Sequence, residues 1–237
     1  MSEGGAKLAR VRDALFELIK PGLTAMDIEE AAVRLIKEEG AEASFKKVQG
    51  YSWATCINVN TGVVHGIPKK STVFKENDVV SVDVGVYFRG FHTDTAVTKY
   101  LGKNPEIIKF LEIGKRAVKN AIAAATAGNK IGDIARAYED TLKSAHLNPI
   151  WTLTGHGVGR ELHEDPYIPC YVGHTADERV IIEPGMTLAL EVMYTPGSGD
   201  IVLDEDGWTL RTKDAKIAAL FEETVAVTPK GTKILTQ

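Results

Sequence analysis

Four strand-like segments of this chain each carry a carboxylate among apolar residues, and this feature constrains the fold more than any other. The four carboxylates are Asp83, Asp94, Glu191 and Glu222. An ionised side chain inside an apolar strand is costly unless a partner neutralises its charge. For any one of them, an edge position, a turn or a salt bridge is the ordinary interpretation. All four together with a histidine favour one shared solution, which is a bound metal.

Alternation along the strands indicates where these carboxylates point. In 79–86 the four valines face one way, while Ser81, Asp83 and Gly85 face the other. The same alternation places mainly small residues beside the other three acids: Ala96 and Thr98; Thr187, Ala189 and Met193; Thr224, Ala226 and Thr228. A face of small residues leaves room for a ligand, and helices can cover the opposite, apolar face.

Two parts of the chain resemble each other. The matching segments are 21–28 with 127–134, 80–84 with 188–192, and 94–98 with 223–228. The pattern of each part predicts two helices followed by a hairpin with an acid on each strand. Either the chain contains a duplication, or these short segments are similar by chance. A true duplication predicts a pseudo-twofold unit whose strands meet at one site. Since no linker rich in Pro, Ser or Gly divides the chain, we expect a single domain over 1–237 with internal halves of about 3–100 and 105–235.

Periodicity gives a coarse map of secondary structure that belongs to the α/β class. Apolar residues at helical spacing predict helices at 6–20, 25–39, 105–127 and 131–145. Strands are predicted at 54–60, 63–65, 79–87, 92–100, 150–154, 167–171, 186–194 and 221–228.

Composition excludes several function classes. The chain has 237 residues, 44% of them hydrophobic, which is enough for a large core. Its net charge of −4 gives no reason to expect DNA or an anionic membrane as a partner. No apolar run approaches the ~20 residues of a membrane span, and the N-terminus is too polar for a signal peptide. Two cysteines, Cys56 and Cys170, form no disulfide framework, so we expect a reducing, cytoplasmic location.

The ligand types suit a divalent cation such as Mn, Fe(II), Co or Zn. Four carboxylates are too many for one mononuclear site, whereas two metals ~3.5–4 Å apart would use them as bridges. His156 lies between glycines, where a backbone can approach closely, and suits a ligand. His163 could instead donate to a reacting carbonyl, and two structural loop histidines are the alternative. His65 precedes a turn and, taken alone, would more often be structural.

Two common motifs are absent. The spacing of Gly155, Gly157 and Gly159 differs from the dinucleotide-binding fingerprint, and a histidine sits inside it. The helical zinc-protease signature, with two histidines four residues apart around a glutamate, does not occur.

Six segments carry a family resemblance: VVHGIP at 63–68, VDVG at 82–85, GFHTDT at 90–95, GHGVGRELHEDP at 155–166, EPGM at 183–186 and FEET at 221–224. Through them, and over about 3–235, the chain resembles the methionine aminopeptidases of the short type I form. The resemblance implies the pita-bread (creatinase/aminopeptidase) fold, with pseudo-twofold halves around a central antiparallel sheet. It also implies hydrolytic removal of the initiator methionine from nascent polypeptides whose second residue is small.

The same resemblance assigns roles to individual residues. It implies two divalent metal ions per chain (Co, Mn, Fe(II) or Zn), held by Asp83, Asp94, His156, Glu191 and Glu222. Asp83 would chelate, Asp94 and Glu222 would bridge, and Glu191 would also shuttle a proton. Catalysis and substrate binding would further involve His65 near the scissile amide and His163 at the oxyanion. The walls of the methionine pocket would include Tyr51, Cys56 and Trp208.

Several positions depart from the family pattern without removing a ligand. They are Phe45, Val48, Leu162, Cys170, Leu220 and Glu223, and they put the pocket shape and substrate preference in question. The pairs Lys46-Lys47 and Lys69-Lys70 could contact ribosomal RNA, although a solvated basic edge is the more ordinary interpretation. We expect a monomer.

Two rival functions remain at this point. One is a sister peptidase of the same fold that cleaves Xaa-Pro bonds, which usually carries a substantial preceding domain. The other is a binding protein that uses the scaffold without catalysis, against which the intact set of carboxylates and histidine argues.

Overall fold

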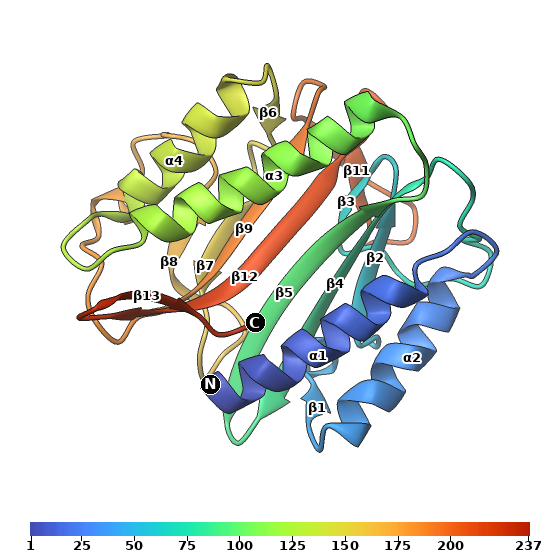
Figure 1. Ribbon diagram of the computed structural model, residues 1–237, viewed down its shortest axis with the longest axis horizontal. Coiled ribbons are helices and arrows are strands. Elements are labelled where there is room, and N and C mark those ends of the chain that lie inside the picture. The colour runs from blue at the N-terminus through green and yellow to red at the C-terminus, as the bar shows by residue number, and fades with distance from the viewer.

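The computed structural model describes all 237 residues, Met1–Gln237, and places four α-helices over one face of a ten-stranded sheet (Figure 1). The helices are α1 (Ser2–Leu18), α2 (Ala25–Glu38), α3 (Pro105–Ala124) and α4 (Ile131–Lys143), and two short 3-10 turns are η1 (Phe45–Lys47) and η2 (Asp177–Arg179). None of these helices combines the length and the hydrophobicity that a membrane crossing requires.

The main sheet is antiparallel throughout, in the order β1-β4-β5-β12-β9-β7-β8. These strands are β1 (Glu42–Ala43), β4 (Val79–Phe88), β5 (Phe91–Tyr100), β7 (Thr154–Gly157), β8 (Glu164–Pro169), β9 (Thr187–Thr195) and β12 (Ala219–Thr228). Three more strands each pair with one strand of this order: β2 (Thr55–Val59) with β4, β6 (Asn148–Pro149) with β9 and β13 (Gly231–Ile234) with β12. A small second sheet consists of β3 (Gly62–Val64), β10 (Ile201–Leu203) and β11 (Leu210–Thr212).

Each half of the chain has its own apolar core. In the first half, α1 packs on β4 and β5 while α2 packs beside α1 and against β1 and β2, and Leu8, Ile28 and Val82 lie buried in the core that they share. In the second half, α3 packs on β9 and β12 while α4 packs on β8 and β6, and Tyr138 and Val192 lie buried in the core that they share. The halves join where β5 pairs with β12, in the middle of the sheet (Figure 1). The pseudo-twofold, pita-bread arrangement expected from the sequence is therefore present.

The same turn precedes the second helix of each half. Gly22 and Gly128 have φ angles of 91° and 92°, in a region that glycine adopts without strain. Asp27 and Asp133 each accept a hydrogen bond at 2.7 Å from the backbone N–H three residues earlier, which caps α2 and α4. The repeat read in the sequence thus corresponds to a repeated local structure.

The predicted elements differ from the structure in a few places. The expected strand at 150–154 is wrong, because Trp151 lies in a turn and strand β7 starts only at Thr154. Glycine has a low strand propensity, so the segment around His156 reads as a loop although it is paired on both sides. Helix α1 begins at Ser2 rather than at residue 6, and the short strands β1, β6, β10, β11 and β13 were not predicted.

Candidate metal centre and substrate pocket

Backbone pairing aligns five residues in one row across the sheet. Cys56 pairs with Asp83, Asp83 with Ala96, Ala96 with Glu222, and Glu222 with Glu191. Directly paired residues on neighbouring strands project from the same face, so the three carboxylates of this row point the same way. Ala96 in the middle carries only a methyl group, which leaves open space between them.

Asp94 and His156 complete the group from the next row. Asp94 is two residues from Ala96 on β5, and His156 pairs with Ala189, two residues from Glu191. One ligand atom each of Asp94, His156 and Glu222 lies within 4.8 Å of the others. Glu191 Oε1 is 3.7 Å from His156 Nε2. The two halves of the sheet thus bring four carboxylates and one imidazole together.

The glycines beside His156 have a packing reason. A Cβ atom on Gly155 would lie 2.6 Å from the carbonyl oxygen of Ala189, and one on Gly157 would lie 2.3 Å from the carbonyl oxygen of Asp165. Both distances are shorter than real contacts allow, so only glycine lets β7 fit between β8 and β9. The two glycines therefore allow β7 to pair closely with its neighbours, which places His156 beside Ala189 of β9.

Burial and mutual repulsion govern the charge state of this group. Burial, followed by repulsion from Asp94, raises the pKa of Glu191 and Glu222 well above that of an ordinary glutamate. Burial and repulsion from Asp94 likewise raise the pKa of Asp83 well above its ordinary value, and burial raises the pKa of Asp94 to about 7. Burial lowers the pKa of His156 to about 4, which keeps the imidazole neutral, as a metal ligand must be.

Two carboxylate oxygens without hydrogen-bond partners indicate whether a cation fits the site. Asp83 Oδ1 and Glu222 Oε1 are buried and have no hydrogen-bond partner. A buried carboxylate oxygen without a partner is destabilising, and a cation between the carboxylates would supply the missing interaction. Carboxylate oxygens with an imidazole nitrogen form a donor set that divalent transition metals accept. The residues present therefore fit a divalent metal ion.

Two further histidines lie at the opening of the site. The His156 and His163 rings are 4.4 Å apart between centroids. His65 follows β3 with a φ angle of 58°, in the left-handed region that few non-glycine residues adopt. Partial desolvation in the pocket lowers the pKa of His65 and of His163. Each ring is therefore neutral at pH 7 and keeps one N–H to donate.

An apolar wall faces the carboxylates across a cavity of about 160 Å³. This wall consists of Phe45, Val48, Tyr51, Cys56, Leu162 and Trp208. The Tyr51 and Trp208 rings pack edge to face, with centroids 5.1 Å apart, and the Tyr51 hydroxyl donates to the Thr55 carbonyl oxygen at 2.8 Å. Burial raises the pKa of the Cys56 thiol, so it belongs to the wall as a neutral group.

All ten site residues named from the sequence line this one cavity: Tyr51, Cys56, His65, Asp83, Asp94, His156, His163, Glu191, Trp208 and Glu222. Three of the departures from the family pattern, Phe45, Val48 and Leu162, line it as well, whereas Cys170, Leu220 and Glu223 do not. Val64 also lines the cavity and was missed. Its signal in the sequence is its place in the matched segment 63–68, directly before His65.

Comparison with known proteins identifies the family of the chain. The model of metallopeptidase family M24 matches residues 1–229. A methionine aminopeptidase of Aquifex aeolicus is 40% identical, over 97% of this chain and 92% of its own length. The crystal structure of a methionine aminopeptidase from Thermotoga maritima superposes with a TM-score of 0.96 at 39% identity, covering 100% of this chain and 95% of that one.

More distant structures share only the fold. The prolidase from Pyrococcus furiosus has a TM-score of 0.78 at 22% identity, and the match covers 100% of this chain but 62% of that chain. Full-length similarity in sequence and in structure thus lies with the aminopeptidases, and the chain belongs to metallopeptidase family M24, among its methionine aminopeptidases.

Proposed function

We propose that this protein hydrolyses the first peptide bond of polypeptides that begin with methionine and carry a small second residue. The observation that supports this most directly is the apolar wall beside the carboxylates. Tyr51 and Trp208 offer aromatic surfaces to one unbranched, apolar side chain, and thioether sulfur interacts favourably with aromatic rings. A side chain seated there would place its own peptide bond next to the metal ligands.

We assign two divalent cations to the site, with Co, Mn, Fe(II) and Zn as candidates. Asp83, Asp94, His156, Glu191 and Glu222 would hold them, with Asp83 chelating and Asp94 and Glu222 bridging. When bound, such a pair lowers the pKa of water and polarises the scissile carbonyl.

The protein's own groups handle the protons and the oxyanion. A Glu191 carboxylate oxygen accepts a proton from the attacking water as the carbon–oxygen bond forms. It returns that proton to the leaving amine as the carbon–nitrogen bond breaks. His163 donates its N–H to the carbonyl oxygen, which gains negative charge in the transition state. His65 binds the amide of the second residue and orients it.

The preference for a small second residue follows from the same placement. In a peptide bound this way, the second residue lies at the cavity opening among His65, His163 and Leu162. A bulky side chain there would displace an imidazole from the reacting amide.

The remaining features of the proposal concern the whole chain. Since ligands come from both halves, we propose that residues 1–237 act as one catalytic domain and that a monomer suffices. Nascent polypeptides in the cytoplasm are the proposed substrates, and both cysteines are free, as a reducing compartment requires. A ribosome contact through the Lys46-Lys47 and Lys69-Lys70 pairs has weaker support, because Lys47 and Lys69 pair with Glu42 and Asp206.

The test is an assay of the metal-stripped protein reloaded with Mn, Co, Fe(II) or Zn. We expect metal-dependent release of methionine from Met-Gly-Met and Met-Ala-Ser, and no turnover of an Xaa-Pro peptide. Cleavage of the Xaa-Pro peptide alone would assign the chain to the sister activity. Metal binding without any turnover would overturn the proposed reaction, and tight RNA binding by such an inactive preparation would favour a binding protein.

A further inference from the structure

The two halves meet along a contact between β5 and β12 that we call the seam. Only two residue pairs form its backbone ladder, Ala96 with Glu222 and Thr95 with Glu223. The hairpin partners on either side are paired more fully, with ten pairs between β4 and β5 and eight between β9 and β12. The proposed bridging ligands, Asp94 and Glu222, lie on opposite sides of the seam. Its geometry therefore sets the distance between them.

Threonine hydroxyls hold the seam where the ladder is missing. The Thr224 hydroxyl accepts a hydrogen bond from the Asp94 N–H at 2.9 Å and donates to the Asp94 carbonyl oxygen at 2.7 Å. The Thr98 hydroxyl binds both backbone groups of Leu220 in the same way, at 3.1 and 2.6 Å. A single hydroxyl thus replaces a backbone pair at each end, which leaves the seam dependent on side chains.

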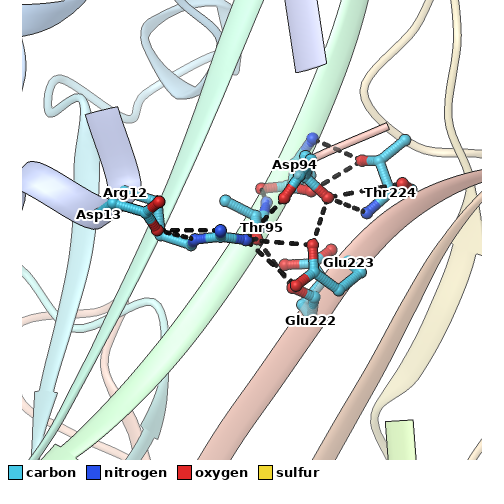
Figure 2. A network of polar contacts seen from close by, with 8 residues as sticks. Arg12, Asp13, Asp94, Thr95, Glu222, Glu223 and Thr224 are labelled. Atoms are coloured by element: carbon cyan, nitrogen blue, oxygen red, sulfur yellow. Dashed lines mark hydrogen bonds and ion pairs between the residues drawn. The ribbon is translucent and has the colours of Figure 1, made fainter. Parts of the chain in front are cut away.

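A third side-chain cluster holds the seam from the helix face (Figure 2). Arg12 of α1 places its Nη1 atom 3.1 Å from both carboxylate oxygens of Glu223 and 2.8 Å from the carbonyl oxygen of Thr236. The same atom lies 3.5 Å from Thr95 Oγ1, and Thr95 donates to the Glu222 carbonyl oxygen at 2.8 Å. Arg12 therefore joins β5, β12 and the C-terminal segment at one point.

This ion pair lies on the helix face of the sheet and is largely shielded from water. The Arg12 side chain is 12% exposed and that of Glu223 is 26% exposed. The Thr236 hydroxyl donates to Glu223 and accepts from the Thr224 N–H. Arg12 also pairs with the exposed Asp13 at 2.9 Å, whereas Arg12 is the only cation paired with Glu223. Removing Arg12 would therefore leave the Glu223 carboxylate partly buried without a cation.

We propose that Arg12 and Glu223 are positioning residues that fix the separation of Asp94 and Glu222 and thereby the affinity of the site for its second metal ion. Glu222 and Glu223 are neighbours on β12 and project from opposite faces, so an anchor on one fixes the other. Asp94 and Thr95 are likewise neighbours on β5 that project from opposite faces, so a contact that holds Thr95 also fixes the position of Asp94. This inference rests on the proposed function, because it takes Asp94 and Glu222 as metal ligands.

A purely electrostatic or a purely stabilising role for Arg12 would give different results. If Arg12 acted only through its charge, its removal would strengthen metal binding, since a cation near a cation site is repulsive. If Arg12 served only stability, its removal would lower the melting temperature and leave the affinity of the folded protein unchanged. A positioning role predicts weaker binding by protein that is fully folded.

The experiment compares metal-free, full-length wild type with Arg12→Met by calorimetric titration with Mn(II), at a temperature where circular dichroism shows both to be folded. We expect the second Mn(II) to bind about tenfold more weakly to the variant, in the range that loss of an outer-shell partner causes. Electron paramagnetic resonance with two equivalents of Mn(II) should also show weaker coupling between the spins. Arg12→Lys should restore most of the affinity, because one nitrogen makes all these contacts.

Lys115→Met is the matched control. Lys115 lines the same groove between α1 and α3, but its ammonium pairs with Glu112 on its own helix at 2.9 Å. It should leave both Mn(II) affinities unchanged. Unchanged or tighter binding in Arg12→Met would overturn the positioning role.

Two further variants keep the result interpretable. Asp94→Ala should abolish binding of the second Mn(II), and failure of that variant to do so would refute the metal centre itself rather than the role of Arg12. If Arg12→Met does not fold, Thr236→Val removes one hydroxyl from the same cluster and should weaken the second Mn(II) by about threefold, as expected for one hydrogen bond. No change in a folded Thr236→Val protein would then count against the proposal.

Discussion

The two sides of the pocket belong to different kinds of backbone, which we call the strand side and the loop side. The carboxylates and His156 project from strands whose pairing fixes their register across the sheet. The apolar wall opposite comes mostly from irregular segments: Phe45 lies in η1, and Tyr51, Leu162 and Trp208 lie outside any strand or helix. Only Cys56 belongs to both sides.

We expect the strand side to carry the reaction and the loop side to bind the substrate side chain. A ladder of backbone hydrogen bonds holds the proposed metal ligands, so we expect a change there to alter the reaction itself. Loop side chains hold the wall by packing, as the contact between Tyr51 and Trp208 illustrates, and loops tolerate substitution better. The departures at Phe45, Val48 and Leu162 all fall on the wall, and none falls on a proposed metal ligand. We therefore expect large, uniform losses on the strand side and smaller, substrate-dependent losses on the loop side.

The largest effect should come from Asp94→Ala. Loss of a proposed bridging ligand should reduce kcat/KM by at least about 100-fold, because even outer-shell partners of a metal cost up to that much. Metal content by atomic spectroscopy should fall with activity while circular dichroism stays unchanged. Asp206→Asn, on the loop that carries Trp208, is the control and should retain its metal. Near wild-type activity in Asp94→Ala would remove the distinction between the two sides.

His65→Ala should reduce kcat by about 100-fold, the lower range for loss of a group that acts on the reacting amide. Metal content should not change, and a loss of metal would instead make His65 a ligand. His146→Ala is a matched control, since His146 has a similar left-handed backbone, with a φ of 56°, and lies outside the pocket. It reports the backbone contribution alone.

Trp208→Ala should raise KM for Met-Gly-Met by about tenfold and leave kcat nearly unchanged, because the ring contributes ground-state binding of an apolar side chain. Steady-state kinetics on peptides with methionine and norleucine at the first position would measure this. Trp53→Ala serves as the control, as Trp53 packs on Tyr51 at 5.3 Å but does not line the cavity. An equal loss of kcat in Trp208→Ala would place the wall in the chemical step.

Tyr51→Phe should have the smallest effect. It removes the hydroxyl that donates to the Thr55 carbonyl oxygen and keeps the aromatic ring, so KM should change by about threefold or less. A lower melting temperature with unchanged kcat is the expected result of thermal unfolding and kinetics. A collapse of activity would show that this hydroxyl contacts substrate.

The strand side was largely predictable from the sequence, because its signals are local. Alternation places Asp83 opposite the valines of β4, and Val80, Val82, Val84 and Val86 do pack in the core beneath the helices. The exact alignment of the row was not predictable, since it depends on how β5 pairs with β12. The two strands are more than 100 residues apart in the chain, and no hairpin turn sets their register.

Two other features lacked a readable signal. Strand β7 was missed as a strand because its glycines serve close packing against β8 and β9, and glycine is also the residue most typical of loops. The pairing of Arg12 with Glu223 spans 211 residues. An arginine in an amphipathic helix looks like any solvated charge until its partner strand is in place.

The meeting of the chain ends has a consequence for how this protein can be encoded. Gly5 packs so closely on Leu235 that a Cβ atom would lie 2.3 Å from the Leu235 carbonyl oxygen, and both ends lie beside the seam (Figure 1). The connection between the halves, in contrast, passes through Lys103 and Asn104, which are exposed. A gene that joins the ends through a short linker and opens between Lys103 and Asn104 would therefore specify a circular permutant with the same contacts and the reverse order of halves.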